Sequence, residues 1–453
     1  MRVEGASSDA NAREAIEPRL GTFDTAMVVV SLVVGIGIFR TPAIVARETG
    51  AAGLFLIAWG IGGLVSLVGA LTFAEIGSRH PRAGGYYRVV ADCYHPALAF
   101  MLNWAQTLMQ GAGAAGVAFI GAEYLVGLLL APERRDPGSV FLVALVLMLV
   151  LLAMNALGIR VGSRTQNVLS VLKIVMIVGL AVAALALAPR AAATATTTGA
   201  APLVPPAGLA AALIPVFYAY GGYHMTMNLG ADVRDARKRF PLAVTAGMLT
   251  VVGLYLVINY AYVRTLGTQG VAASTLVAAA LARASLGPAG EKVVSALIFL
   301  SAAGFVNATV FQMPRSFHAM AEDGALPAVF RRVDPRTQVS RAGLLLFGVT
   351  MLVPAFVLGS FEKLLNYVIF TDMVTLVVAS STLFVLRRRQ RESGEDGAFR
   401  IPGYPVLPAL YILALAAVGA HVAFTEPRLA AAGMGILLTG GPLFLLGRRL
   451  SRP

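Results

Sequence analysis

Long apolar stretches, separated by short polar connections, follow one another along the whole chain. A helix needs about 20 mostly apolar residues to cross the hydrocarbon core of a bilayer, and the stretches are of about that length or longer. The pattern therefore predicts an all-α membrane protein with twelve transmembrane helices. Their predicted ranges are 21–48, 51–77, 94–130, 139–158, 166–188, 208–231, 240–263, 291–320, 341–359, 363–386, 405–424 and 429–447.

Composition indicates the same class of protein. Of the 453 residues, 57% are hydrophobic and only 13% are charged, whereas a soluble domain has about 25% charged residues. The mean hydropathy is +0.76. We therefore expect a multi-pass membrane protein. Its single cysteine, Cys93, falls in a predicted connection and leaves no intrachain disulfide to form.

The net charge of +13 is unevenly divided between alternate connections. Those on one side of the membrane, with the C-terminal tail, hold 22 Lys and Arg residues, and those on the other side hold 8. Because basic connections stay in the cytoplasm, we predict that the tails 1–20 and 448–453 are both cytoplasmic. The basic charge then orients the protein in the cell membrane, and no nucleic acid partner is expected.

Glycine-rich sequences interrupt two of the predicted helices. The first is GIG at 35–37 in the first span, and the second is YGGY at 220–223 in the sixth. Unpaired backbone groups are too costly to face lipid, so a break at membrane depth must line a protein cavity. One break in each half of the chain indicates the substrate site of a secondary transporter. The alternative is that these glycines only allow helices to pack closely.

Five motifs, in a consistent order, carry a family resemblance. They are GIGIF at 35–39, AEIG at 74–77 followed by PRAGGY at 81–86, FYAYGGY at 217–223, Arg315 with AEDGALP at 321–327, and FRIPGYP at 399–405. The chain resembles the amino acid–polyamine–organocation (APC) superfamily, as an amino acid permease similar to the L-type amino acid transporter branch.

The resemblance implies a five-plus-five inverted-repeat (LeuT-like) core with broken helices 1 and 6. Helices 1–5, at 21–188, and helices 6–10, at 208–386, would be two copies related by an axis in the membrane plane. Helices 11 and 12, at 405–447, would be peripheral. The glycine breaks agree with this arrangement, since each falls in the first helix of one repeat.

The resemblance also implies where an amino acid would bind. Its carboxylate would accept hydrogen bonds from the free amides at 36–38, and its ammonium would donate to carbonyls near Val33 and at 218–220. The family's serine between the two glycines is Ile36 here, so only backbone donors remain. The candidate substrate-binding residues are Val33, Gly35, Ile36, Gly37, Ile38, Tyr218, Ala219, Tyr220, Gly221, Tyr223 and His224.

Two of these residues carry further expectations. By similarity to the family, Tyr218 would be an aromatic lid over the bound substrate. His224 occupies a position where the family often has asparagine, so the resemblance implies that it contacts the substrate or tunes the pH dependence of transport. The alternative for His224 is a structural histidine that is hydrogen-bonded to a neighbouring carbonyl.

Lys173 lies inside a predicted span, where a cation is costly unless it is paired, deprotonated or solvated by carbonyls. In the L-type transporters, which this segment resembles, a helix 5 lysine occupies the place where sodium-coupled relatives hold sodium, beside the helix 1 break and helix 8. The resemblance therefore implies sodium independence, and it makes Lys173 the candidate for proton coupling. The alternative is that Lys173 extends to the cytoplasmic interface near Arg164.

Arg40 and Asp372 are isolated, opposite charges within predicted spans. In sodium-coupled neurotransmitter symporters, which share the fold, an arginine two residues before a proline pairs with a helix 10 aspartate, and Arg40 has that position. We predict that Arg40 and Asp372 form an outer gate with Tyr218; the alternative is that each is solvated separately. Glu75 and Arg315, near predicted cytoplasmic ends, are the candidates for an inner gate.

The sequence thus predicts a secondary active transporter of amino acids, with neutral L-amino acids as substrates because the site is aliphatic and aromatic. Proton symport, exchange and uniport remain open, and the alternatives are a transporter of other amines or polyamines and a transporter-like amino acid sensor. No His, Cys or carboxylate cluster has catalytic or metal-ligand spacing, so no enzyme activity, metal or cofactor is expected. The connection 131–138 lacks cysteine, so no disulfide-linked heavy chain is expected.

Overall fold

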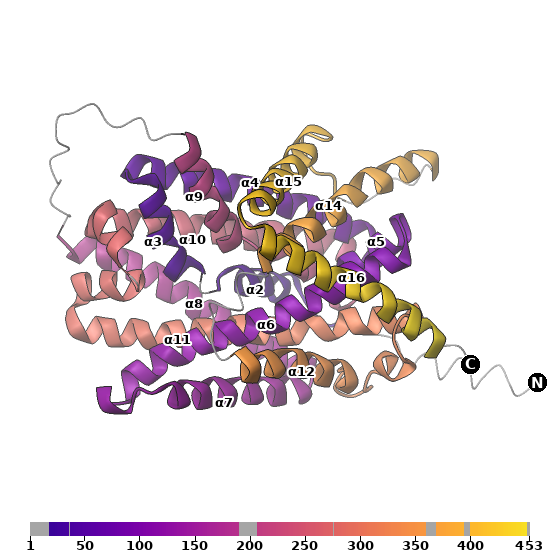
Figure 1. The fold of residues 1–453 in the computed structure, drawn as a ribbon, viewed down its shortest axis with the longest axis horizontal. Coiled ribbons are helices and arrows are strands. Elements are labelled where there is room, and N and C mark those ends of the chain that lie inside the picture. Colours follow the sequence, from indigo (N-terminus) through magenta and orange to yellow (C-terminus); the bar gives the residue numbers. More distant parts are fainter. Residues whose placement is uncertain are drawn as a thin grey trace, which may run out of the picture.

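Long apolar runs favour helices, because a helix pairs its own backbone groups within the membrane. The computed structural model of the chain is accordingly a bundle of helices (Figure 1). It describes residues 18–35, 37–189, 206–274, 276–358, 368–393 and 399–450, among which only two isolated bridges, and no strands, occur beside the helices. The α-helices are α2 (Thr22–Val33), α3 (Gly37–Thr49), α4 (Ala52–Arg79), α5 (Gly85–Cys93), α6 (Pro96–Leu129), α7 (Pro137–Ala156), α8 (Ile159–Leu187), α9 (Pro206–Ala219), α10 (Ala236–Ala273), α11 (Val277–Glu322), α12 (Arg341–Leu358), α14 (Val368–Ser393), α15 (Val406–Thr425) and α16 (Pro427–Leu450).

Within the described residues, the predicted transmembrane ranges overlap helices of the structure, and residues 363–367 of the tenth range lie outside the described residues. Among the described residues, nine helices are long and apolar enough to cross a membrane, and α2 with α3, bent by 44°, makes a tenth span if the pair counts as one. The other two ranges contain α12, which is shorter, and α9 with the 3₁₀ turns η2 (Tyr223–Asn228) and η3 (Gly230–Asp232). A mostly helical protein with many candidate spans is confirmed for the described residues, whereas the count of twelve and the inverted repeat stay predictions.

Helix boundaries differ from the prediction on one side of the bundle. The sequence suggested a long connection between the seventh and eighth spans, but α10 continues to Ala273 and α11 begins at Val277. Glycine explains the difference, because Gly267 (φ 69°) and Gly287 (φ 71°) kink the two helices. A left-handed backbone at glycine lets each chain segment change direction and resume the helix.

The connection after α4 also contains a helix that the hydrophobic pattern missed. α5 follows Gly84, whose φ is 94°, and it packs against α6. Tyr86, Tyr87 and Cys93 of α5 are buried, and the cysteine that was expected in a connection lies inside this helix. α5 has only nine residues, and a criterion based on about 20 apolar residues overlooks so short a helix.

Helices enclose both breaks. α2 lies in the middle of the bundle, against α8, α10 and α11, and α6, α7, α11 and α12 run side by side in the lower half of Figure 1. Close to the breaks, Trp59 packs edge-on against Tyr220 and Tyr255, with ring centroids 5.8 and 5.7 Å away. The surrounding helices therefore hold the broken segments away from lipid, as unpaired backbone groups require.

Candidate functional site

The two helix breaks lie next to each other. α2 ends at Val33 and α9 ends at Ala219, and the Tyr255 hydroxyl of α10 is 3.1 Å from the carbonyl oxygen of each. A hydroxyl has only one proton to donate, so the two carbonyls share one donor. Tyr255 therefore joins the broken ends of the two helices through a single side chain.

Glycine permits this close approach. At Gly222 the backbone has a φ of 105°, and a Cβ atom there would lie 2.5 Å from the carbonyl oxygen of Leu32. A Cβ atom on Gly37 would lie 3.1 Å from the Cα of Ala219. Both contacts join one broken helix to the other, so close packing is part of what these glycines do.

The breaks also open into one cavity of about 560 Å³. Eight candidate substrate-binding residues line it, together with Leu32, Phe305 and aliphatic residues of α6, α14 and α15. The cavity therefore combines backbone groups of two broken helices with a largely apolar wall, as small-molecule sites do. The eight candidates are Val33, Gly35, Gly37, Tyr218, Ala219, Gly221, Tyr223 and His224.

Two other candidates, Ile38 and Tyr220, do not line the cavity, and a third cannot be placed. Ile38 is fully buried. The Tyr220 hydroxyl donates to the Trp59 carbonyl at 3.3 Å, and its ring packs on Tyr255 instead of lining the cavity. Ile36 is outside the described residues. Any role of these three in substrate binding stays a prediction.

Polar side chains gather on one part of the cavity wall. Gln106 of α6 donates from Nε2 to Oδ1 of Asp372, on α14, at 2.9 Å. The Nε2 atom of His224 is 3.8 Å from the same oxygen. Arg40 lines the same cavity from α3. The structure therefore brings both predicted outer-gate charges to one cavity, while the Arg40–Asp372 ion pair stays a prediction.

Lys173 of α8 is buried between the first helix break and α11. Its side chain is 2% exposed, and Nζ donates a hydrogen bond to the carbonyl of Val34, in the first break. On its other side, a Cβ atom added to Gly304 of α11 would lie 3.3 Å from Nζ. The ammonium therefore sits between the helix 1 break and α11, and the alternative in which it extends to the interface does not hold.

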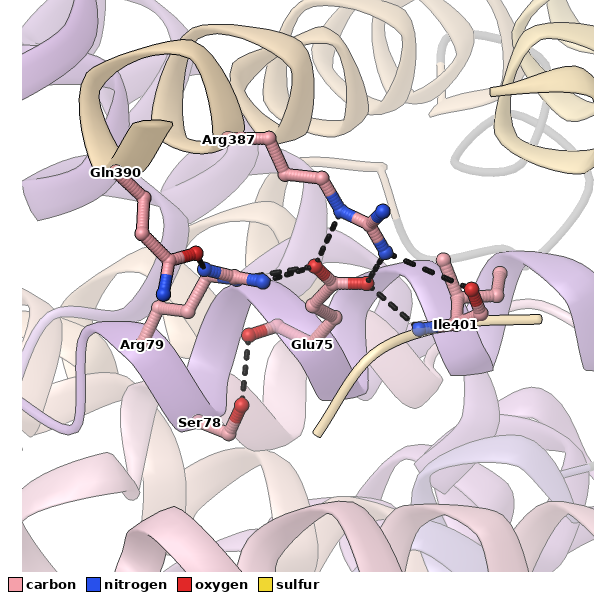
Figure 2. A network of polar contacts seen from close by, with 6 residues as sticks. All are labelled: Glu75, Ser78, Arg79, Arg387, Gln390 and Ile401. Carbon is pink, nitrogen blue, oxygen red and sulfur yellow. Dashed lines mark hydrogen bonds and ion pairs between the residues drawn. The ribbon is translucent and has the colours of Figure 1, made fainter. Parts of the chain in front are cut away.

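A buried cluster of ionic groups surrounds Glu75, which is 0% exposed (Figure 2). Arg387 of α14 binds both carboxylate oxygens, at 2.7 and 2.8 Å, and Arg79 binds Oε1 at 2.5 Å. The N–H of Ile401 donates to Oε2 at 2.7 Å. The guanidinium of Arg387 also stacks 3.8 Å from the ring centre of Tyr404. Glu75 thereby ties α4 to α14 and to the segment before α15.

Arg315 belongs to a second buried cluster. Its Nη2 and Nε atoms are 3.1 and 3.2 Å from the two oxygens of Asp232, and both side chains are buried. This pair joins α11 to η3, which follows the second break. Glu75 and Arg315 therefore serve two separate clusters. Their role as an inner gate stays a prediction.

Comparison with known proteins assigns the chain to a family. A model described as amino acid permease matches residues 20–441, a range that includes every residue of the cavity. The chain belongs to the amino acid permease family, in the APC superfamily. Amino acid transport by a multi-pass integral membrane protein follows from this membership and from the candidate spans.

Three named relatives are similar in sequence to the permease over nearly its whole length. The serine/threonine exchanger SteT of Bacillus subtilis (strain 168) is 27% identical over 400 residues, covering 88% of the permease and 89% of SteT. The human large neutral amino acids transporter small subunit 2 is 27% identical over 444 residues, covering 96% and 81%. The human Asc-type amino acid transporter 1 is 26% identical over 450 residues, covering 98% and 84%. The resemblance to the L-type branch is confirmed.

Several side chains that contact the candidate site residues were not predicted from the sequence. Tyr255, Asp232 and Arg387 lie far along the chain from the residues they contact. Asp232 was visible as an acid shortly after the second break, and Arg387 as the first residue of an arginine run at a helix end. Tyr255 had no such signal, because a tyrosine within an apolar helix is most often a core residue.

Replacing Glu75 by glutamine should lower the thermal stability of the permease strongly. Loss of one partner from a buried ionic cluster costs about 3–5 kcal/mol, and here it would leave Arg387 and Arg79 without their carboxylate. Detergent-solubilised protein should therefore aggregate at a clearly lower temperature in size-exclusion chromatography. The matched control is Glu291→Gln, which removes the exposed partner of Arg283 and should change little. Equal melting temperatures of the two variants would contradict a stabilising role for the ionic cluster around Glu75.

Proposed function

We propose that the permease is a secondary active transporter that carries neutral L-amino acids across the cytoplasmic membrane by alternating access, without sodium, through proton symport or exchange. The observation that carries the proposal is the opening of both helix breaks into one cavity of about 560 Å³. Cavities that bind small molecules measure about 300–1,000 Å³, so an amino acid fits.

The backbone at the breaks suits a zwitterion. α3 begins at Gly37, and a helix start offers N–H groups and a partial positive charge, which favour a carboxylate. α2 and α9 end at Val33 and Ala219, and helix ends offer carbonyls, which favour an ammonium group. Because both kinds of group meet in one cavity, an amino acid suits it better than a simple amine or a polyamine.

Two observations support an uncharged side chain on the substrate. Arg40 and Asp372, one positive and one negative residue, line the same cavity, so its charged lining is balanced in sign. The names of the three relatives refer to serine and threonine, to large neutral amino acids, or to amino acids in general. A net cationic or anionic substrate would lack a dedicated counter-charge in this wall.

The position of Lys173 supports transport without sodium. Its Nζ atom contacts the Val34 carbonyl, so a covalently attached cation already occupies the oxygen that a free cation would need. Within the described residues, Nζ of Lys173 contacts a neutral carbonyl and no carboxylate, and an ionisable residue at membrane depth is a candidate for a functional role. Lys173 is therefore the proposed coupling residue if transport is driven by protons.

The proposed topology has twelve spans in two inverted repeats plus α15 and α16, with both termini in the cytoplasm. In that frame the Glu75 and Arg315 clusters close the cytoplasmic side, and Arg40, Asp372 and Tyr218 gate the outer side. The proposed permease works without a disulfide-linked heavy chain, since the connection 131–138 has no cysteine.

Uptake into proteoliposomes tests the proposal. Purified permease would be given radiolabelled neutral amino acids, arginine, glutamate and putrescine in sodium-free buffer, with and without an inward proton gradient and with and without internal amino acid. We expect saturable, sodium-independent uptake of neutral amino acids, stimulated by the gradient or by internal substrate. Absence of amino acid uptake by folded protein, or strict dependence on sodium, would refute it.

The outer gate can be tested by exchanging its charges. Arg40→Asp and Asp372→Arg should each reduce uptake to background, because each places two like charges at the gate. The double variant should recover a measurable fraction of uptake if the two side chains meet in the closed state. A double variant no better than either single variant would show that the two charges act separately.

A further inference from the structure

The polar part of the cavity wall contains side chains with unused hydrogen-bonding groups. Within the described part of the chain, Oε1 of Gln106 and both ring nitrogens of His224 have no hydrogen-bond partner. Gln106 is 2% exposed and His224 is 1% exposed, and both line the cavity. Buried polar groups without partners are costly, so these atoms indicate a place for a ligand or water inside the cavity.

Asp372 adds an acceptor to the same part of the wall. Its contacts with Gln106 and His224 both use Oδ1, and its side chain is 19% exposed, more than the side chain of His224 at 2%. A carboxylate is acceptor-only, with about four lone-pair sites. Asp372 and Gln106 together therefore offer oxygen acceptors from two helices, and His224 adds ring nitrogens from the end of the second break.

The rest of the neighbourhood is apolar. His224 is packed between the rings of Phe73, Tyr86 and Tyr223, with centroids 5.8 to 6.1 Å from its own. The Tyr223 hydroxyl is already engaged with that of Tyr411 at 2.7 Å. An aliphatic substrate side chain at this place would leave Oε1 of Gln106 and the ring nitrogens of His224 without hydrogen-bond partners.

We propose that Asp372, Gln106 and His224 form a specificity subsite that selects amino acids with an uncharged, hydrogen-bond-donating side chain, meaning a hydroxyl or a carboxamide. The inference rests on the proposed function, since it concerns the side chain of the amino acid that the breaks bind. A hydroxyl donates to Asp372 or Gln106 and accepts from His224. The lining of the cavity holds one positive and one negative residue, Arg40 and Asp372, so the subsite suits polar neutral side chains rather than cationic ones.

Isosteric substrate pairs test this subsite. Threonine and valine have the same shape, but valine has a methyl group in place of the threonine hydroxyl. Asparagine and leucine are also similar in shape, but leucine has two methyl groups in place of the carboxamide oxygen and nitrogen. A site built to bond a substrate hydroxyl rejects the analogue that lacks it strongly, whereas an apolar pocket separates such isosteres poorly. Competition against a radiolabelled neutral substrate in proteoliposomes should therefore favour threonine over valine, and asparagine over leucine, by about tenfold or more.

Variants connect this preference to the proposed residues. Asp372→Leu should reduce the threonine-to-valine ratio to about one by strengthening valine relative to threonine, and Gln106→Met should reduce it partially. The controls are Thr375→Val and Thr107→Val, which remove hydroxyls that bond only within α14 and α6, to Thr371 and Asn103 carbonyls. Both control variants should keep the wild-type ratio. If Asp372→Leu does not fold, Gln106→Met carries the test.

Each outcome distinguishes the subsite from the proposed function. Amino acid uptake with equal or stronger competition by valine and leucine would refute the subsite and leave the transporter proposal standing. Preferred competition by arginine or lysine would also refute it, because Asp372 would then act as a counter-charge. Absence of uptake of any amino acid by folded wild-type protein would refute the proposed function itself.

Discussion

Replacing Gly222 by alanine should abolish transport and remove most of the folded permease. A residue with a side chain pays about 1–2 kcal/mol for a left-handed backbone, and Gly222 has a φ of 105°. The added Cβ would also lie 2.5 Å from the Leu32 carbonyl oxygen, a backbone atom that has no rotamer by which to move away. The two broken helices would be forced apart at the cavity. Fluorescence-detected size-exclusion chromatography and uptake by the same preparation would measure both effects.

Gly253→Ala is the matched control for this substitution. Gly253 lies within α10, where an added Cβ meets nothing within 4 Å. Alanine in a helix interior is more stable than glycine by roughly 0.5–1 kcal/mol, so this variant should fold and transport normally. A Gly222→Ala variant that behaved like Gly253→Ala would contradict the contact between the broken helices.

Replacing Lys173 by methionine should reduce uptake by about a hundredfold, because loss of a charged partner from a buried group costs up to about 3 kcal/mol and tenfold corresponds to 1.4 kcal/mol. Methionine keeps most of the side-chain volume, but it cannot donate a hydrogen bond to the Val34 carbonyl in the first break, as Lys173 does. Any residual uptake should no longer respond to an inward proton gradient. Initial uptake rates with and without the gradient would measure both consequences.

Lys292→Met provides the comparison for Lys173. Lys292 is an exposed residue of α11, so its loss removes a lysine without touching a break, and uptake should remain at the wild-type level. A Lys173→Met variant that kept both the rate and the gradient response of wild type would show that the ammonium serves neither the break nor the coupling.

Hydrophobic pattern and motifs predicted much of the fold, for a physical reason. Crossing a bilayer requires about 20 apolar residues in a helix, and that requirement is local in the sequence. The same locality explains the misses. α5 is short, and the kinks at Gly267 and Gly287 depend on a backbone conformation that glycine allows but does not require.

The residues of the candidate site also separate into those that the sequence predicted and those that it did not. Val33, Gly35, Gly37, Tyr218 and His224 could be assigned to one cavity because breaks in two membrane helices have to meet inside protein. Side-chain partners could not be assigned, since each depends on tertiary contacts.

Asp372 illustrates the difference. Its charge marked it as functional, but its contacts with Gln106 and His224 depend on how α6, α14 and η2 pack together. The pairing of Arg315 with Asp232, and of Glu75 with Arg387, likewise joins residues from separate helices and turns.

The most direct test of the account asks whether the permease recognises both ends of a zwitterion. Uptake of a radiolabelled neutral amino acid would be competed with the same unlabelled amino acid, with its decarboxylated amine and with its α-hydroxy acid. If the α3 start binds the carboxylate and the α2 and α9 ends bind the ammonium, each analogue should compete at least about a hundredfold more weakly, as expected when a charged hydrogen-bonding partner is lost. Equal competition by the amine or by the hydroxy acid would contradict recognition at the helix breaks.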